Sequence, residues 1–409
     1  MVDKENYIKN MNVDNQSANK TKTSIESRIH VVDALRGFAI VSIMFLHNIE
    51  HFDFYYSPTN LPAWMVRLDK GIWDSLFFLF GGKSYAIFAL LFGLTFFIQS
   101  NNQEKRGKDF RGRFAWRLVL LLAFGLINSA FYEGDILTIY AVIGFVLIPV
   151  ATLGNSTVFW IAFLLMLQPY EWINFLNGLQ NPDLKMVDPV SWSYFGKIGE
   201  YITGNSLLKT WIGNLTTGKI GVLIWNWENG RVFQTASLFM FGMLAGRKAL
   251  FVMSAESKRF WVKTLIIAFI LFIPLFIAKN GIGHWVNSVA IHRPLITIIS
   301  SWSNMAFMLV LVSGFVLLFQ TRFFHRFLNV FSSFGRMSLS NYIMQSIIGS
   351  FIYYGFGLGL YQYTGATFCL LIGIVLAVLQ GCFSSWWFKH RTKGPLETIW
   401  HNVTWVGSK

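Results

Sequence analysis

Residues 28–52 read RIHVVDALRGFAIVSIMFLHNIEHF, an apolar run of about 20 residues that ends in polar groups. A run of this length spans a bilayer when it forms a helix. Similar runs recur along the 409-residue chain, in which 54% of the residues are apolar, 17% are aromatic and only 13% are charged. A soluble protein usually carries about 25% charged residues. The composition therefore excludes a soluble globular enzyme and a disordered chain, and it predicts a polytopic membrane protein.

The apolar segments predict an all-α fold, a membrane bundle of about ten transmembrane helices. Lipid offers no hydrogen-bond partners, so only helices and closed barrels can span it, and no alternating pattern indicates a barrel. The sequence GGKS at 81–84 interrupts the second span and predicts a broken or kinked helix there. The expected spans are residues 33–52, 73–99, 114–131, 136–153, 156–174, 231–247, 260–278, 295–320, 337–358 and 366–388.

The distribution of basic residues sets the expected orientation. With the N-terminus inside, Lys and Arg collect in the inner connections, as the positive-inside rule requires. The short outer turn around Glu133 and Asp135 carries no basic residue. We therefore expect both ends of the chain in the cytoplasm, and the net charge of +14 needs no nucleic-acid partner. The two richest inner connections carry Lys105, Arg106, Lys108, Arg111, Arg113 and Arg117, and Arg247, Lys248, Lys258, Arg259 and Lys263.

Three regions are expected along the chain. Residues 1–32 form a polar cytoplasmic tail that lacks the apolar core of a signal peptide. Residues 33–388 form the transmembrane bundle, and residues 389–409 form a basic cytoplasmic tail. Within the bundle, residues 175–230 make a long outer connection, and the helix-like spacing of its apolar residues predicts interfacial helices over the outer mouth.

The first span carries the sharpest candidate residues, because ionisable groups inside a span are costly and usually functional. Arg36 and His47 are eleven residues apart, which places them about 20° from the same helix face with a rise of about 16 Å. Glu50 and His51 follow at i+3 and i+4 from His47. Glu50 is a candidate to orient the imidazole as a general base. Snorkelling of Arg36 and interfacial hydration of Glu50 and His51 are the alternative explanations.

Further candidates lie in the second and fourth spans. Lys83, followed by Ser84, separates two apolar halves and needs an anion, a carbonyl group or water as a partner. Asp135 precedes an apolar run, so a helix N-cap explains it as well as a functional role does.

The ninth span carries a polar stripe. Ser338, Asn341 and Gln345 recur at i, i+3 and i+7, and Tyr342 lies beside them. Interhelical hydrogen bonding is the alternative explanation of this stripe. Arg336, at the inner end of the same span, is a candidate contact for a phosphate group.

Several ordered motifs extend over residues 28–407. They include DALRGFAI from residue 33, GGKSYAIFALLFG from residue 81, GDILTIYAVIG from residue 134, GRMSLSNYIMQSIIG from residue 335 and GPLETIW from residue 394. Together they resemble the YeiB-like family (domain of unknown function 418), which is similar to the transmembrane acyltransferase superfamily. The resemblance implies a ten-helix bundle that takes acyl-CoA from the cytoplasm and acylates an acceptor on the far side.

In the related acyltransferase-3 enzymes an Arg, ten intervening residues and a His mark the site, and Arg36 and His47 match that spacing. Many YeiB-like sequences instead carry a His in the third span, where this chain has Asn128. The chemistry agrees with the superfamily pattern, since a thioester attack needs a general base near neutral pKa, donors for the oxyanion and cations for the CoA phosphates.

The expected site has three parts. The catalytic candidates are His47, Glu50, Lys83 and Asn341. The candidates that bind the acyl-CoA phosphates are Arg36, Arg113, Arg117, Arg336 and Arg391. The candidates that contact the acceptor are Asn48, His51, Ser84, Asp135 and Gln345.

Acyl-CoA, of the acetyl-CoA type, is the expected co-substrate, and no metal is expected because the chain has no HExxH motif and no dense Cys/His cluster. Cys369 and Cys382 fall in one expected helix, roughly 20 Å apart, which is too far for a disulfide. The expected location is the plasma or inner membrane of a bacterial cell. The acceptor, whether a small molecule, a glycan or a lipid, stays open, as do the acyl length and an oligomer.

Two other classes of protein fit the sequence. One is a transporter or permease for a small anionic or amphiphilic solute, with the broken second span, Lys83 and Asp135 forming a midplane site. The other is a non-catalytic membrane protein that keeps a pocket without turnover.

Overall fold

The computed structural model describes residues 30–53, 56–184 and 186–406 of the chain. All regular secondary structure within these residues is helical, which confirms the predicted all-α class. The expected N-terminal tail lies almost entirely outside the described residues, so it stays a prediction.

The helices follow one another closely. The N-terminal half contains a first helix (His30–Ile49), then α2 (Ala63–Phe80), α3 (Ser84–Glu104), α4 (Arg111–Phe131), α5 (Leu137–Gly144), α6 (Leu147–Val150), α7 (Asn155–Met166) and α8 (Pro169–Gln180). The long connection contains α9 (Val190–Phe195), α10 (Gly199–Ile202), α11 (Leu207–Gly213), the π-helix η1 (Asn214–Gly218) and α12 (Lys219–Glu228). The C-terminal half contains α13 (Arg231–Arg247), α14 (Ala255–Trp285), α15 (Val289–Phe319), α16 (Arg322–Leu328), α17 (Phe331–Arg336), α18 (Ser338–Tyr353), the 3₁₀ turn η2 (Leu360–Gln362), α19 (Ala366–His390) and α20 (Pro395–Thr404).

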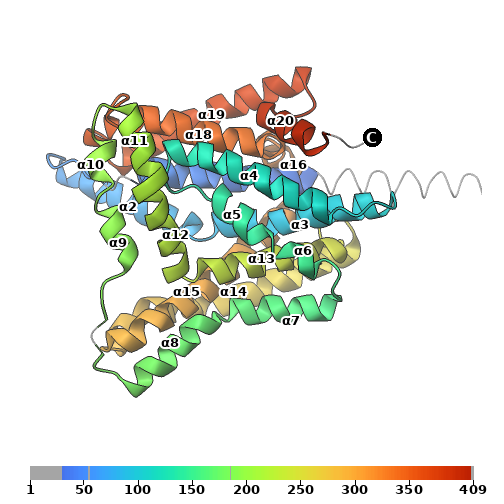
Figure 1. The fold of residues 1–409 in the computed structure, drawn as a ribbon, viewed down its shortest axis with the longest axis horizontal. Helices are drawn as coiled ribbons and strands as arrows, with labels where there is room; N and C mark the ends of the chain where they lie inside the picture. Colours follow the sequence, from blue (N-terminus) through green and yellow to red (C-terminus); the bar gives the residue numbers. More distant parts are fainter. Residues whose placement is uncertain (1–29, 54–55, 185, 407–409) are drawn as a thin grey trace, which may run out of the picture.

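The helices α3, α4, α13, α18 and α19 run along the longest axis of the molecule (Figure 1). The short helices α9–α11 of the long connection gather at one end, while α16 and α20 lie toward the other end, near the C-terminus (Figure 1). The long connection is therefore helical, as its apolar spacing predicts, and it lies away from the end of the bundle that carries α20.

Within the described residues, six stretches are long and apolar enough to cross a bilayer, which indicates a multi-pass membrane protein. They are His30–Ile49, Ala63–Glu104, Arg111–Phe131, Ala255–Trp285, Val289–Phe319 and Ala366–His390. The other four expected spans are helical but shorter, since α13 has 17 residues, α18 has 16, and two spans are split into the pairs α5–α6 and α7–α8. The predicted count of about ten spans and the cytoplasmic placement of both ends remain predictions.

Local chemistry explains the interruptions. Gln168 separates α7 from α8 in a left-handed conformation with φ of 60°, and Pro169, which has no N–H group, begins the next helix. In the second expected span, α2 ends at Phe80 and α3 begins at Ser84. The intervening Gly82 has φ of 76°, a backbone conformation that glycine adopts readily. The break predicted at GGKS is therefore present.

The core of the bundle forms where α3 meets α13. Gly93 of α3 faces the backbone of Phe239, and Gly242 of α13 faces the backbone of Leu90, so that a Cβ at either glycine would overlap a carbonyl group. Such small residues let two helix backbones approach closely in a membrane protein. By contrast, only 17% of the most apolar window of α14 is buried, which leaves its apolar surface for lipid.

Candidate functional site

The first helix is held against α17 by a second close approach of glycines. A Cβ at Gly37 would overlap the carbonyl of Phe331, and a Cβ at Gly335 would overlap the carbonyl of Asp33. This contact fixes the first helix along the bundle interior, with Arg36 toward one end and His47 eleven residues further on. Two separate cavities open along that helix, one at each of these residues.

We name the larger one, of about 460 Å³, the histidine cavity. His47 and Glu50 of the first helix both line it and are half-buried. The imidazole of His47 packs against the ring of Tyr132, with the ring centroids 4.6 Å apart. The other polar and aromatic residues of its wall are Asp53, Phe77, Phe80, Ser84, Tyr85, Trp192, Phe195, Trp225, Asn226, Arg231 and Tyr342.

Asp53 reaches this cavity through an unusual turn. His51, Phe52 and Asp53 are consecutive residues with φ between 51° and 65°, a conformation that costs non-glycine residues roughly 1–2 kcal/mol each. Such strain persists where the surrounding structure imposes it, often at functional sites. The turn carries the chain back so that Asp53 joins His47 and Glu50 in one wall.

A single guanidinium group lies across the same cavity. Arg231, the first residue of α13, lies over the ring of Trp225 at 4.0 Å and over the ring of Tyr85 at 4.4 Å. These cation–π contacts hold the group in place without neutralising its charge. The histidine cavity therefore combines a base, two carboxyl groups and one cation inside an aromatic wall.

Asp53 of this wall and the fully buried Glu133 form an acidic pair outside the membrane-spanning stretches. Burial raises the pKa of Asp53, although the hydroxyl of Tyr132 donates a hydrogen bond to it. Burial raises the pKa of Glu133 to about 8, and the negative charge of Asp53 adds to the shift. The hydroxyl of Tyr354 bridges the carbonyl of Phe52 and the carboxyl group of Glu133, at 3.0 and 3.4 Å.

The second cavity, of about 280 Å³, is the arginine cavity. Its wall contains the basic residues Arg36, Arg117, Arg336 and Lys393, together with Glu397, Trp400 and His401. These residues come from the first helix, α4, α17, α20 and the segment that precedes α20. Such a concentration of guanidinium groups is typical of a site for phosphate or carboxylate groups.

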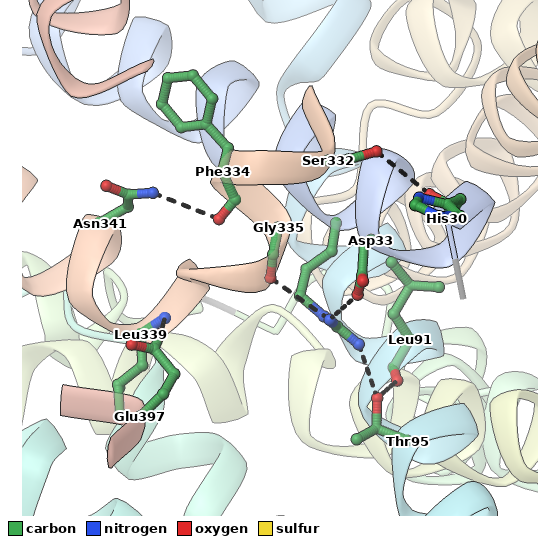
Figure 2. Close-up of polar contacts among 11 residues, drawn as sticks. His30, Asp33, Leu91, Thr95, Ser332, Phe334, Gly335, Leu339, Asn341 and Glu397 are labelled. Carbon is green, nitrogen blue, oxygen red and sulfur yellow. Dashed lines mark hydrogen bonds and ion pairs between the residues drawn. The ribbon is translucent and has the colours of Figure 1, made fainter. Parts of the chain in front are cut away.

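Arg36 is fixed on three sides. Its guanidinium donates to Asp33 Oδ1 at 2.9 Å, to Thr95 Oγ1 at 2.9 Å and to the carbonyl of Gly335 at 3.4 Å. Figure 2 shows Asp33, Thr95 and Gly335 converging on this group from three different segments. Arg36 is therefore an ordered, partly neutralised cation and not a side chain that extends freely to the surface.

The wall formed by α20 is held by two kinds of contact. The ring of Trp400 stacks on the guanidinium of Arg117 at 4.1 Å, and its indole N–H donates to the carbonyl of Arg117. The carboxylate of Glu397 accepts the backbone N–H groups of Leu339 and Ser340 at 2.7 and 3.1 Å. Glu397 thus satisfies the free N–H groups at the start of α18 and fixes α20 against it.

Three of the five arginines expected at an acyl-CoA site line the arginine cavity, namely Arg36, Arg117 and Arg336. Arg113 lies one turn from Arg117 on α4 and donates to the carbonyl of Thr404 at 2.7 Å, outside the cavity wall. Arg391 is exposed at the end of α19. Of the catalytic candidates, His47 and Glu50 share the histidine cavity, and the acceptor candidate Ser84 lies there too.

Lys83 and Asn341, the other two catalytic candidates, do not line the histidine cavity. Lys83 points to the carbonyl of Phe77 at 3.4 Å and lies 5.6 Å from the ring of Phe307. Asn341 is buried and donates to Phe334 and Ser384 in helix packing, the contact that Figure 2 shows for Phe334.

The remaining acceptor candidates also serve packing. Asn48 pairs with the hydroxyl of Tyr353, and His51 Nε2 lies 2.7 Å from the carbonyl of Thr364. Asp135 accepts the N–H of Thr138 at 2.9 Å, which is the capping geometry named as its alternative, and it also pairs with Lys219. Gln345 is buried on α18 and lines neither cavity, and its side-chain amide has no hydrogen-bond partner among the described residues.

The fold therefore defines a class: a helical multi-pass membrane protein with a histidine-containing cavity and an arginine-rich cavity along one helix. Residues 245–407 match the model of the family described as "Protein of unknown function (DUF418)", which confirms the predicted resemblance to that family. The acyltransferase relationship is not part of that match.

Two curated relatives match almost the whole chain. The uncharacterized protein YxaH of Bacillus subtilis (strain 168) is 29% identical over 94% of this chain and 96% of its own length. An uncharacterized 39.9 kDa protein from the amylase 3′ region of Bacillus acidopullulyticus is 24% identical over 93% of this chain and 95% of its own length. No solved structure matches the chain.

Proposed function

We propose that the protein is an integral-membrane acyltransferase that moves an acyl group from acyl-CoA to a hydroxyl or amine group of an acceptor. In this proposal the arginine cavity faces the cytoplasm and binds the CoA phosphates, and the histidine cavity receives the acceptor from the other side of the cell membrane. A multi-pass protein with cavities toward both ends of one helix suits a reaction whose two substrates come from opposite sides.

The observation that carries the proposal is the placement of Arg36 and His47. Both residues lie on the same continuous helix, Arg36 in the wall of the arginine cavity and His47 in the wall of the histidine cavity. The rise between them is about 16 Å, a distance that the linear arm of CoA can cover. The phosphates and the thioester of one molecule would then occupy both cavities at once.

The proposed reaction needs only one proton carrier. His47 takes the proton as the acceptor oxygen or nitrogen attacks the thioester carbon, and the carbon–sulfur bond then breaks. The imidazolium returns the proton to the departing thiolate, which leaves as CoA thiol. Glu50 lies in the same wall and keeps its expected role of orienting the imidazole, and Arg231 is the donor within the cavity that faces the developing oxyanion.

The first test is acyl transfer by purified protein in detergent or liposomes, with radiolabelled acetyl-CoA and a panel of acceptors. Replacing His47 by Ala is expected to lower the rate by about 10²-fold or more, the usual range for a lost general base. His292→Ala, on α15 and outside both cavity walls, is the matched control and should leave the rate unchanged. Transfer at the normal rate by the His47 variant would overturn the proposed mechanism.

The transporter hypothesis has less support. It places Lys83 and Asp135 in one midplane site, but neither residue lines either cavity. Asp135 is paired with Lys219, and Lys83 lies against aromatic rings. Both residues therefore have local partners that explain their burial.

A further inference from the structure

One residue lines both cavities. Tyr342 of α18 belongs to the wall of the histidine cavity and also to the wall of the arginine cavity. It is 3% exposed, so little of its surface reaches either cavity. Of the described residues that line these cavities, Tyr342 is the one that the two walls share.

Two further tyrosines line one cavity each. Tyr85 lines the histidine cavity and Tyr140 lines the arginine cavity. The hydroxyl of Tyr140 donates to the backbone carbonyl of Tyr85 at 2.6 Å, and the hydroxyl of Tyr85 pairs with Gln234. These two rings are therefore tied to the α3–α5–α13 packing, and a movement of either one would disturb the core.

Tyr342 is held differently. Its hydroxyl accepts one hydrogen bond, from the backbone N–H of Ile136 at 3.2 Å. Ile136 immediately precedes α5, and the first N–H groups of a helix lack partners within that helix. Water entering either cavity can replace the phenol oxygen at this donor, so the side chain can turn without leaving a buried group unsatisfied.

We propose that the two cavities are one interrupted passage, and that rotation of Tyr342 opens it to a thin, linear chain. The identity of that chain rests on the proposed function: it is the thioester arm of acyl-CoA, which has to pass this ring to reach His47. Tyr342 is then a positioning residue that determines whether the thioester arrives, while the phosphates are bound independently in the arginine cavity. The existence of the passage does not depend on the enzyme activity.

The passage can be tested without an acyl-transfer assay. In a chain with Cys369 and Cys382 replaced by Ser, Leu46→Cys places a thiol in the wall of the histidine cavity. A small charged methanethiosulfonate is added only on the side of the arginine cavity, in sealed vesicles. Tyr342→Ala should raise the labelling rate of this introduced thiol several-fold, whereas Tyr342→Phe, which keeps the ring, should raise it much less.

Arg326→Cys, exposed on α16, is the control, and its thiol should react at the same rate in each background. The proposal would be overturned if the thiol at position 46 were labelled at the same rate with Tyr342 present and with Tyr342→Ala, while the control thiol reacted normally. If labelling increased in a protein that transfers no acyl group, the result would support the passage and reject only the proposed acyltransferase function.

In an active enzyme the prediction becomes kinetic. Tyr342→Trp, whose larger ring narrows the passage, should lower kcat for acyl transfer several-fold. It should leave KM for acyl-CoA nearly unchanged, since the phosphate contacts are intact. A purely structural role would instead lower the melting temperature and change both constants together, and that result would reject the assignment of Tyr342 as a positioning residue.

Discussion

His47, Glu50 and Asp53 act within one wall although a regular helix would not bring all three together. On an ideal helix, residues six apart point about 120° apart around the axis, so Asp53 would lie on another face than His47. The left-handed backbone of His51–Asp53 returns the carboxyl group of Asp53 to the wall that holds His47 and Glu50. The carboxyl group then lies where the hydroxyl of Tyr132 reaches it and where its charge acts on Glu133.

This arrangement predicts a pH-dependent stability to which Glu133 contributes at the higher pH. Burial, with a further contribution from Asp53, raises the pKa of Glu133 from an ordinary 4.5 to about 8 in the folded protein. The folded state therefore holds a proton that the unfolded state releases. The stabilisation is complete below the ordinary pKa, and it is lost as the pH rises through about 8, at up to about 1.4 kcal/mol per pH unit.

Thermal unfolding across this pH range measures the effect. Glu133→Gln, which stays neutral, should flatten the dependence above about pH 6, the pKa to which burial raises Asp53, whereas Glu104→Gln, exposed at the end of α3, should keep it. An unchanged pH profile in the Glu133 variant would show that another group binds the proton.

At the scale of the element, close helix contacts position the arginine cavity. Gly37 and Gly335 let the first helix and α17 touch at their backbones, and the carbonyl of Gly335 accepts a hydrogen bond from Arg36. We expect Gly335→Ala to cost about 1–3 kcal/mol of stability, as overpacking does, and to displace Arg36. Gly314→Ala, at a helical position with open space around it, is the matched control and should be neutral or slightly stabilising.

The two variants are compared by chemical or thermal denaturation of the purified protein. Equal stability of the Gly335 and Gly314 variants would mean that the two helices separate without cost, and the close contact would then have no role in placing Arg36.

The sequence predicts most helices because apolar length is a direct signal, and it predicts the break at Gly81–Lys83 because GGKS is visible as a motif. It predicts His47 and Glu50 together because both follow the helical period. It does not predict Arg231, because α13 begins at that residue and only the packing of α12 and α3 turns it toward the cavity. The same holds for Trp400 and Glu397, whose contacts with α4 and α18 join segments more than 50 residues apart.

At the scale of the whole molecule, the two cavities differ in charge. The arginine cavity collects three guanidinium groups and Lys393, and the histidine cavity holds two carboxyl groups with a single Arg. An anionic ligand is therefore attracted to the first cavity and disfavoured by the carboxyl groups of the second. This asymmetry gives a direction to the passage that Tyr342 closes, with a polyanionic head retained at one end and a neutral arm free to cross.

The asymmetry predicts a ranking among arginines that appear equivalent in the sequence. Acyl-CoA in excess should raise the melting temperature of the purified protein, by an amount that corresponds to about 2.7 kcal/mol at a concentration one hundred times Kd. Arg117→Ala, in the cavity wall, should weaken binding by about ten- to one hundredfold, because a hydrogen bond to a charged group contributes about 1.5–3 kcal/mol. Arg391→Ala, exposed outside the cavity, should bind normally when each variant is compared with its own ligand-free form. Equal weakening by both variants would show that the phosphates lie on the open surface, and no shift with any acyl-CoA would remove the basis for an acyl-CoA site in the arginine cavity.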